Sequence, residues 1–174
     1  MTLCPNCNAE NIEGTDNCVD CGQPLDDTTL PPPKNEVERT LLQDHISVLA
    51  PNTPIAVDPT TPLGDVLRLM VNRNIGCVIV AEGQQPVGIF SERDALHKVN
   101  TEAKAYSDRP VSEFMTPKPE TEVADAKIAF AVRRMDLGSY RHLPIVSENG
   151  DLVGTISARD ILRHLTETMA SESS

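Results

Sequence analysis

The sequence has few aromatic residues and no tryptophan. Aromatic side chains make up 3% of the 174 residues, whereas 39% of the residues are hydrophobic. The chain can therefore build a core, but that core must be aliphatic, and aliphatic cores pack well around parallel strands rich in Val and Ile. A chain of this length has room for one ordinary domain or two small ones.

Positive charge is scarce as well. There are 15 Lys and Arg residues against 26 Asp and Glu, which gives a formal net charge of -11. Nucleic acids and anionic membranes attract basic surfaces. The charge balance therefore disfavours general affinity for either of them.

Long apolar runs are missing too. The first residues, MTLCPNC, have neither the basic segment nor the apolar stretch of a secretory signal. No stretch approaches the roughly 18 apolar residues that are needed to span a bilayer. We therefore expect a cytoplasmic protein, whose five cysteines are metal ligands or buried thiols rather than disulfides.

Composition divides the chain into segments. Residues 1–25 hold four of the cysteines, and residues 26–36 form a polar linker whose three consecutive prolines favour an extended spacer. A packed α/β pattern follows, which we divide into 37–105, with a leading helix, and 106–168. The acidic, Ser-rich residues 169–174 are expected to be a disordered tail.

The four N-terminal cysteines form two CxxC pairs, Cys4 with Cys7 and Cys18 with Cys21. Two intervening residues allow a turn to aim both sulfurs at one point, and four thiolates complete the tetrahedron that Zn²⁺ prefers. The segment has too few apolar side chains to fold by burial alone, so metal binding would supply its stability. The spacing predicts a structural zinc site; a redox CxxC site and disulfides are the alternatives.

This segment resembles the zinc ribbons that precede many prokaryotic domains. The residues around it are acidic, and no Lys or Arg occurs before Lys34. We therefore expect the ribbon to contact a protein or to have an architectural role rather than to bind nucleic acid.

The rest of the chain contains an internal repeat. Gly76–Leu96 matches His142–Leu162 at a constant offset of 66 residues. Each copy has a short apolar run, a Gly-containing turn, a second strand and a helix. These strands are expected at 77–81 and 86–90 in the first copy, and at 143–147 and 152–156 in the second.

A further helix is expected before each copy. In the first copy its apolar face is Leu63, Val66, Leu67, Met70 and Val71. In the second copy it is Val123, Ala126, Ile128, Ala129, Val132 and Met135. The two helix starts differ by 60 residues, which predicts six additional residues around 134–140. The fold class is therefore α/β, with two β-α-β-β-α units of about sixty residues packed as a pair.

The most informative element is GIFSERD (residues 88–94), which recurs as GTISARD (residues 154–160). Ser followed three residues later by an acid resembles a capping box. Three features also indicate a nucleotide site: the recurrence, a Gly that permits close approach of a ligand, and an Arg that a cap does not require. A helix N-terminus attracts phosphate, and a carboxylate accepts from ribose hydroxyls. The candidate residues are Ser91, Arg93, Asp94, Ser157, Arg159 and Asp160.

Residues 37–165 resemble a tandem pair of CBS domains, named after cystathionine β-synthase. The hallmark turn of that family, Gly-hydrophobic-x-Ser/Thr-x-x-Asp, is present in both copies. The resemblance implies two units packed through their sheets, often dimerised as a disc, with AMP, ADP, ATP or S-adenosylmethionine bound in clefts. It assigns the ribose to the Asp of each turn. It also implies an adenine site at Ile55, Ala56, Val57, Cys77 and Val78, and a second at Thr116, Pro117, His142 and Leu143.

These observations predict a non-catalytic regulatory homodimer that senses an adenine nucleotide and signals to an unknown protein partner. One alternative is a ligand-independent dimerisation scaffold in which the turns are plain helix caps. Another is a regulator that contacts nucleic acid through its ribbon. An enzyme is not supported, because the sequence contains neither a Ser-His-Asp pattern nor a GxxxxGK[ST] phosphate loop.

Overall fold

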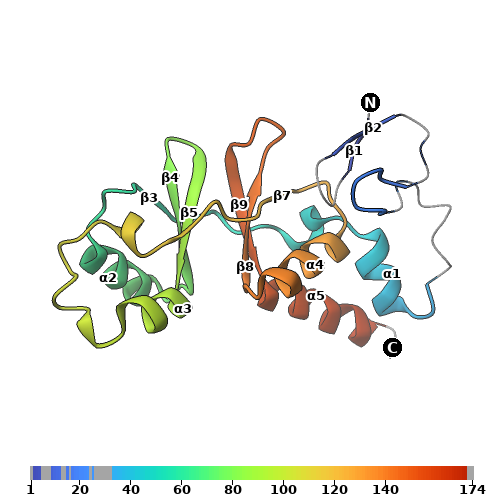
Figure 1. The fold of residues 1–174 in the computed structure, drawn as a ribbon. Coiled ribbons are helices and arrows are strands. Elements are labelled where there is room, and N and C mark those ends of the chain that lie inside the picture. The colour runs from blue at the N-terminus through green and yellow to red at the C-terminus, as the bar shows by residue number, and fades with distance from the viewer. Residues whose placement is uncertain are drawn as a thin grey trace.

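A computed structural model describes residues 2–4, 9–12, 15, 17–23, 25 and 33–171. Cys7 and most of the expected Pro-rich linker lie outside these residues, as do the last three of the tail. The two repeats lie side by side, and the N-terminal strands β1 (Thr2–Leu3) and β2 (Glu10–Asn11) lie at the far end of the second repeat (Figure 1). No helix of the described part combines the length and apolar character that crossing a membrane requires.

Both repeats have the predicted order of strand, helix, strand, strand and helix. The first contains β3 (Ala56–Val57), α2 (Leu63–Arg73), β4 (Cys77–Glu82), β5 (Gln85–Ser91) and α3 (Glu92–Asp94). The second contains β7 (Glu122–Val123), α4 (Ile128–Gly138), β8 (His142–Val146), β9 (Leu152–Ser157) and α5 (Ala158–Ser171). The fold is therefore the expected pair of α/β units. Helix α5 extends to Ser171, into the segment that we expected to be a disordered tail.

The two sheets have matching topology. In the first, β3 is parallel to β4, and β4 and β5 are antiparallel; in the second, β7, β8 and β9 repeat this arrangement. The first sheet gains an edge from β6 (Thr116–Pro117), which precedes the second repeat and pairs with β5. The corresponding position in the second sheet is taken by Asn52, which forms a bridge with Thr155. Each of these segments, residues 46–55 before β3 and residues 111–121 before β7, therefore lies on the edge of the other repeat's sheet. We call these two segments the linkers, as distinct from the Pro-rich residues 26–36.

The linkers also fill the hydrophobic core of the opposite repeat. Val111 of the 3-10 turn η4 (Val111–Glu113) and Phe114 are buried in the first core with Leu63, Val78 and Phe90. The 3-10 turn η1 (Ile46–Leu49) contributes its two end residues to the second core, which also contains Ile128, Leu143, Ile145 and Ile156. Helix α1 (Glu36–Gln43) packs against α4 and α5. The leading helix of segment 37–105 thus lies on the second repeat (Figure 1).

Strand β4 is buried on both of its faces. Val78 and Val80 lie in the first core, while the alternate residues Cys77, Ile79 and Ala81 are also buried. The hairpin β8–β9 of the second repeat stands beside β4–β5 (Figure 1). This two-sided burial explains why the strand is a continuous apolar run instead of an alternating one.

The expected helix in the second repeat begins later than the sequence predicted. Val123 belongs to β7, and α4 starts at Ile128. Helices α2 and α4 have 11 residues each, and both end at a residue with positive φ, Asn74 (51°) and Ser139 (52°). The six additional residues around 134–140 are therefore not present as an extension. Val71, expected on the buried face of α2, is 79% exposed.

The repeat alignment also needs a one-residue correction in its first strand. Cys77 pairs with Ser91 and His142 pairs with Ser157, so Cys77 corresponds to His142 and not to Leu143. Val78 and Leu143 are the matching pair, and both are fully buried in their cores. A slip of one residue moves every side chain of a strand to the opposite face. The extra residue of the second repeat lies in its hairpin turn, between β8 and β9.

Candidate ligand-binding turns and metal centre

The first turn forms the predicted capping box. The backbone N–H and hydroxyl of Ser91 donate to Oδ2 of Asp94 at 2.9 and 2.7 Å, and the N–H of Asp94 donates back to Ser91 Oγ at 3.3 Å. Ser91 is the N-cap of α3. The box satisfies amides that the start of a helix otherwise leaves without a partner. The Ser91 hydroxyl proton is thus already used within the turn.

The other oxygen of Asp94 is also occupied. Oδ1 accepts from the hydroxyl of Thr116 at 3.0 Å and lies 2.8 Å from Nζ of Lys98. Burial alone would raise the pKa of Asp94, but hydrogen bonds from Lys98, Ser91 and Thr116 hold that pKa below its ordinary value. Asp94 is therefore a buried, ionised carboxylate in the first turn of the helix that follows β5.

The second turn repeats the capping box with the same geometry. The N–H and hydroxyl of Ser157 donate to Oδ2 of Asp160 at 2.8 and 2.7 Å. Asn52 donates to the same oxygen at the long distance of 3.4 Å, and Arg163 donates to Oδ1 at 2.5 Å. Burial would raise the pKa of Asp160, but the bonds from Ser157 and the charge of Arg163 lower it.

The glycines of the two turns accommodate the linkers. A Cβ atom at Gly88 would overlap the side chain of Met115, and one at Gly154 would come too close to Pro51. We predicted that these glycines permit close approach of a ligand. In the structure the group that approaches closely is the linker from the other repeat.

The arginines beside the two acids are exposed. Arg93 donates to the carbonyl oxygen of Ser139 at the end of α4, so it joins the first turn to the second repeat. The side chain of Arg159 is exposed and makes no hydrogen bond or ion pair within the described residues. Both arginines remain candidates for contact with phosphate.

The residues predicted to contact adenine do not form the two groups that the sequence predicted. Thr116 and Pro117 were grouped with His142 and Leu143, but they pair with β5 of the first repeat, and Thr116 contacts Asp94. The side chains of Val78 and Leu143 are fully buried in the two cores. Ile55 and Val57 pack against the first core, whereas Ala56 between them is exposed. Cys77 and His142 lie directly beside the two serines of the turns.

Cys77 and His142 lie near the contact between the repeats. Burial, with a smaller effect from Glu92, raises the pKa of the Cys77 thiol to about 12, which agrees with a small buried residue rather than a reactive thiol. The ring of His142 lies so close to Gly76 that a side chain there would collide with it. Burial lowers the pKa of His142, although Glu92 and Asp160 act in the opposite direction.

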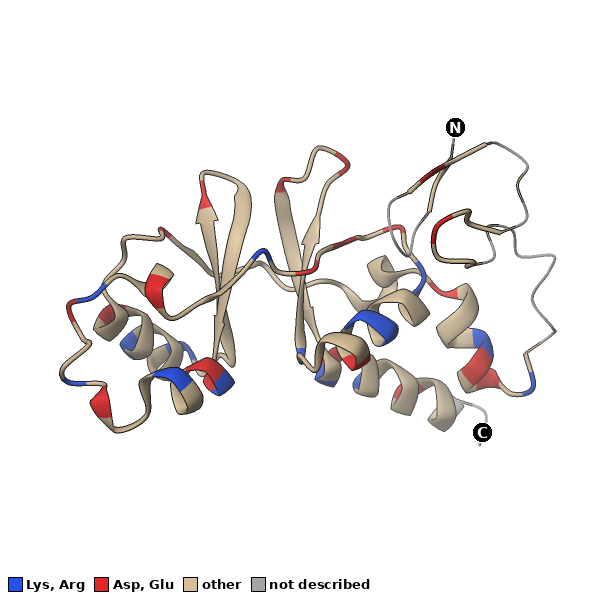
Figure 2. Cartoon of the chain, in the orientation of Figure 1, with Lys and Arg blue, Asp and Glu red and all other residues tan. Residues whose placement is uncertain are grey.

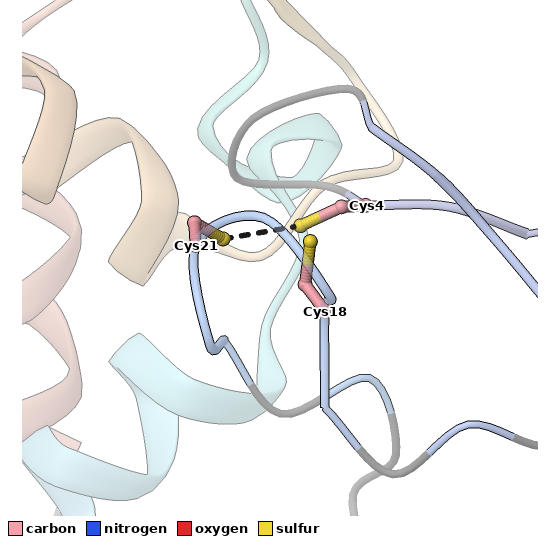
Figure 3. A group of neighbouring side chains, drawn as sticks. All are labelled: Cys4, Cys18 and Cys21. Carbon is pink, nitrogen blue, oxygen red and sulfur yellow. Dashed lines mark hydrogen bonds between the residues drawn. The ribbon is translucent and has the colours of Figure 1, made fainter.

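Three of the predicted zinc ligands converge in the N-terminal segment. The sulfurs of Cys4, Cys18 and Cys21 lie within 4.8 Å of one another and point toward a common centre (Figure 3). The sulfurs of Cys4 and Cys21 are 3.6 Å apart. That separation suits an edge of a tetrahedron of thiolates with bonds of about 2.3 Å, and it is too long for a disulfide. Cys7, the fourth predicted ligand, lies outside the described residues.

A buried amide supports the sulfur cluster. The side chain of Asn11, 1% exposed, donates to Cys18 Sγ at 3.6 Å and accepts from the N–H of Val19 at 2.9 Å. A donor directed at sulfur stabilises a thiolate, as expected around a metal-bound cysteine. The donor set therefore fits a structural zinc ion, with the three described sulfurs as its ligands.

Two hollows of the surface lie apart from the turns. One, of about 350 Å³, is lined by Glu120, Arg133, Arg134, Leu137, Gly138 and Tyr140. The other, of about 920 Å³, lies between α1 and α4. Neither is lined by a predicted ligand-binding residue.

The sequence did not predict three of the residues that contact the acids of the turns. These are Lys98, Arg163 and Asn52. Lys98 and Arg163 lie four and three residues after the acids that they contact, a helical spacing that marks candidate ion pairs. Asn52 contacts Asp160 across 108 residues of sequence, and no local pattern signals such a contact.

Comparison with known proteins identifies relatives of the paired fold. A protein of Acidianus ambivalens, the uncharacterized 17.7 kDa protein in bps2 3'region, is 31% identical over 123 residues, 70% of this chain and 73% of its own length. The Arabidopsis thaliana CBS domain-containing protein CBSCBSPB1 is also 31% identical, but the chain spans only 20% of its length. The structure of the CBS domain protein PAE2072 from Pyrobaculum aerophilum, complexed with AMP, superimposes with a TM-score of 0.60 at 26% identity and covers 71% of this chain and 99% of that one.

The sequence also matches the CBS domain family directly. The match covers residues 46–101 and 111–167, one segment for each repeat. These segments include both Ser-x-x-Asp turns and amount to more than half of the chain. The protein therefore belongs to the CBS domain family, as a tandem pair of CBS domains.

Proposed function

We propose that this chain is a non-catalytic regulatory protein whose paired CBS domains bind an adenine nucleotide, AMP, ADP or ATP, or S-adenosylmethionine. The observation that carries the proposal is the presence of two buried carboxylates, Asp94 and Asp160, held ionised at equivalent turns. A carboxylate in this position is an acceptor for the two hydroxyls of a ribose. The AMP complex of the relative from Pyrobaculum aerophilum supports the choice of ligand class.

The binding residues proposed for the two clefts are those of the turns. Asp94 and Asp160 would hold the ribose, Ser91 and Ser157 would contact ribose or phosphate, and Arg93 and Arg159 would contact phosphate. Ala56, Cys77 and His142 are retained as adenine contacts.

A bound ligand would act by changing how the two repeats lie against each other. Arg93 joins the first turn to the end of α4, so a phosphate that attracts Arg93 competes with that contact. A ligand shifts such an equilibrium only by its differential affinity for the two arrangements. We propose that the shift is passed to a homodimer or to a protein partner in the cytoplasm.

A structural zinc ion held by Cys4, Cys7, Cys18 and Cys21 is part of the proposal. It would fix residues 1–25 as a ribbon at the far end of the second repeat. In the described residues of this segment the charged side chains are acidic (Figure 2). This charge favours a protein contact over nucleic acid.

The capping boxes also support a second candidate, a ligand-independent dimerisation scaffold. The backbone and Oγ-acceptor contacts of Ser91 and Ser157 are those of a capping box, which a plain helix cap also makes. In that case the turns stabilise two helices and bind nothing.

Calorimetric titration with AMP, ATP and S-adenosylmethionine distinguishes the two candidates. The wild type is compared with the double variant Asp94→Ala/Asp160→Ala, and with Asp65→Ala, which removes an exposed acid of α2, as the control. Saturable binding that is lost only in the double variant supports the sensor. Absence of binding by folded, zinc-loaded wild type overturns it and leaves the scaffold.

A further inference from the structure

The two turns differ in how completely their carboxylates are occupied. An ionised carboxylate offers about four acceptor positions. All four are filled at Asp94: the N–H and hydroxyl of Ser91 bind one oxygen, and Thr116 and Lys98 bind the other. Asp160 also receives four donors, but three of them, the N–H and hydroxyl of Ser157 and the more distant Asn52, share Oδ2. Oδ1 of Asp160 accepts from Arg163 as its one donor among the described residues, so one acceptor position of that oxygen stays open.

Lys98 does more than pair with Asp94. Its ammonium group also donates to the carbonyl oxygen of Met115 at 2.9 Å and to the hydroxyl of Thr116 at 3.2 Å. All three of its protons are therefore directed at oxygens, and these oxygens belong to the first turn and to the linker that covers it. We call this set of contacts the Lys98 bridge.

The second repeat has no equivalent of this bridge in the described residues. The residue four positions after Asp160 is His164, which contacts Asp44 at the end of α1, 3.2 Å away. Arg163 reaches Asp160 from within the same helix, is itself 57% exposed, and makes no hydrogen bond or ion pair with the linker in the described residues. The linker residue Asn52 contacts Asp160 only at 3.4 Å.

The backbone after each turn differs as well. In the first repeat α3 is followed by a π-helical turn, η2 (Ala95–Val99), in which the N–H of Asn100 bonds to the carbonyl of Ala95. In the second repeat α5 continues as a regular helix to Ser171. π-helical turns occur often at functional sites, and this one carries Lys98.

Resting on the proposed function, we infer that Lys98 is a built-in occupant of the first cleft, so that an adenosyl ligand fills the second cleft first. A ribose that binds Asp94 must displace Thr116 or Lys98, whereas one that binds Asp160 finds an acceptor position open. One hydrogen bond to a charged group corresponds to about a tenfold difference in affinity. The two clefts are therefore unequal sites of one chain, and the first responds only at higher ligand concentration.

Titration with AMP tests the inference. The wild type is expected to show a tight phase and a phase at least about tenfold weaker, or the tight phase alone. Asp160→Ala removes the tight phase, and Asp94→Ala removes only the weak one. Lys98→Met strengthens the weak phase about tenfold or makes it visible, because it frees an acceptor of Asp94.

Two further variants separate this effect from misfolding. Thr116→Val removes the other donor to Oδ1 without changing charge, and it is expected to act in the same direction with a smaller effect. Arg68→Met removes an exposed cation of α2 that pairs with Asp65, and it is expected to change neither phase. Circular dichroism confirms that each variant is folded.

The outcomes separate this inference from the proposed function. Two phases of equal affinity in the wild type, a tight phase that depends on Asp94, or weaker binding in Lys98→Met would overturn the inference alone. The last result would show that Lys98 holds the ligand instead of excluding it. No binding of AMP by any folded variant would overturn both.

Discussion

The two CBS repeats share a fold and a turn, but they stabilise the same positions with different chemistry. In the second repeat Arg134 contacts Glu122 at 2.7 Å and Glu120 at 2.6 Å, and the Glu122 side chain is 3% exposed. Strand pairing and helix position make Ile55, Val57 and Leu69 the matching residues of the first repeat, and all three pack against its core. An ionic group of three residues in one repeat therefore replaces an apolar group in the other. Both repeats keep the capping box, although they differ in this part of the core. The turn therefore tolerates fewer changes of sequence than this part of the core does.

The largest expected difference between the repeats follows removal of the proposed zinc ion. Metal binding contributes about 10–16 kcal/mol in zinc-finger peptides, so chelation is expected to unfold the ribbon. Gln23 of the ribbon contacts Arg133 of α4 at 3.0 Å. Hydrogen exchange should therefore rise in α4 and remain unchanged in α2. Cys18→Ser should lose the metal, while Cys77→Ala retains it; a reduced wild type that binds no zinc would contradict this prediction.

The ionic group of the second repeat should give the next largest effect. Arg134→Met leaves Glu122 buried without its partner, and breaking such a pair costs about 3–5 kcal/mol. Glu122→Val/Arg134→Leu, which installs the residues of the first repeat, should recover most of this loss in denaturant unfolding. A double variant as unstable as the single one would show that the repeats are not interchangeable here.

The stability lost in Arg134→Met should depend on pH in a defined direction. Burial already raises the pKa of Glu122 despite the opposing effect of Arg134. A raised carboxyl pKa favours the folded state at low pH, and that advantage is lost as the pH rises toward the folded pKa. The unfolding free energy of Arg134→Met should therefore be closest to that of the wild type in acid and furthest below it at neutral pH. A loss that does not vary with pH would contradict this assignment.

The caps should behave alike in the two repeats. Ser91→Ala and Ser157→Ala are each expected to cost about 1 kcal/mol of unfolding free energy at neutral pH. The pKa values of Asp94 and Asp160 are lowered, so their contribution is present above the ordinary carboxyl pKa and is lost as the pH falls through the folded pKa. The cost of each Ser variant should therefore shrink in acid. Unequal costs would show that one turn is not maintained by its cap.

The smallest expected difference in stability between the repeats concerns the residues at which α2 and α4 end. Ser139→Gly should stabilise the protein by about 0.5 kcal/mol, because glycine adopts positive φ without the strain of a side chain. Asn74→Gly should gain less, since Asn tolerates this conformation better. Thermal unfolding of the two variants measures the effect. A larger gain at Asn74 would contradict the explanation.

Local patterns predicted much of this structure. The repeat, the order of strands and helices, and the capping boxes at Ser91 and Ser157 all depend on residues close together in sequence. The convergence of Cys4, Cys18 and Cys21 follows from their spacing in the same way.

The errors arose where the local pattern was ambiguous or the contact was distant. Strand β4 is buried on both faces, so its apolar run carries no alternation that would distinguish Cys77 from Val78 as the partner of Leu143. Val123, Ala126 and Ala129 follow one another at intervals of three residues, which is a helical spacing, but Val123 lies in β7 and Ala126 in the loop after it. The contacts of Thr116 with Asp94 and of Asn52 with Asp160 depend on how the linkers cross, which periodicity does not report.

The crossing of the linkers has a consequence for how such a chain originates. Each repeat receives its edge strand, or the bridge at that edge, together with core residues such as Ile46 or Val111, from the segment that precedes the other repeat. A single repeat with its own preceding arm would have an unfilled core and an open sheet edge. Two separate copies satisfy both needs only by exchanging arms, as in a domain-swapped dimer. The tandem chain joins two such copies covalently, so a cut between the repeats would separate each core from linker residues that it contacts.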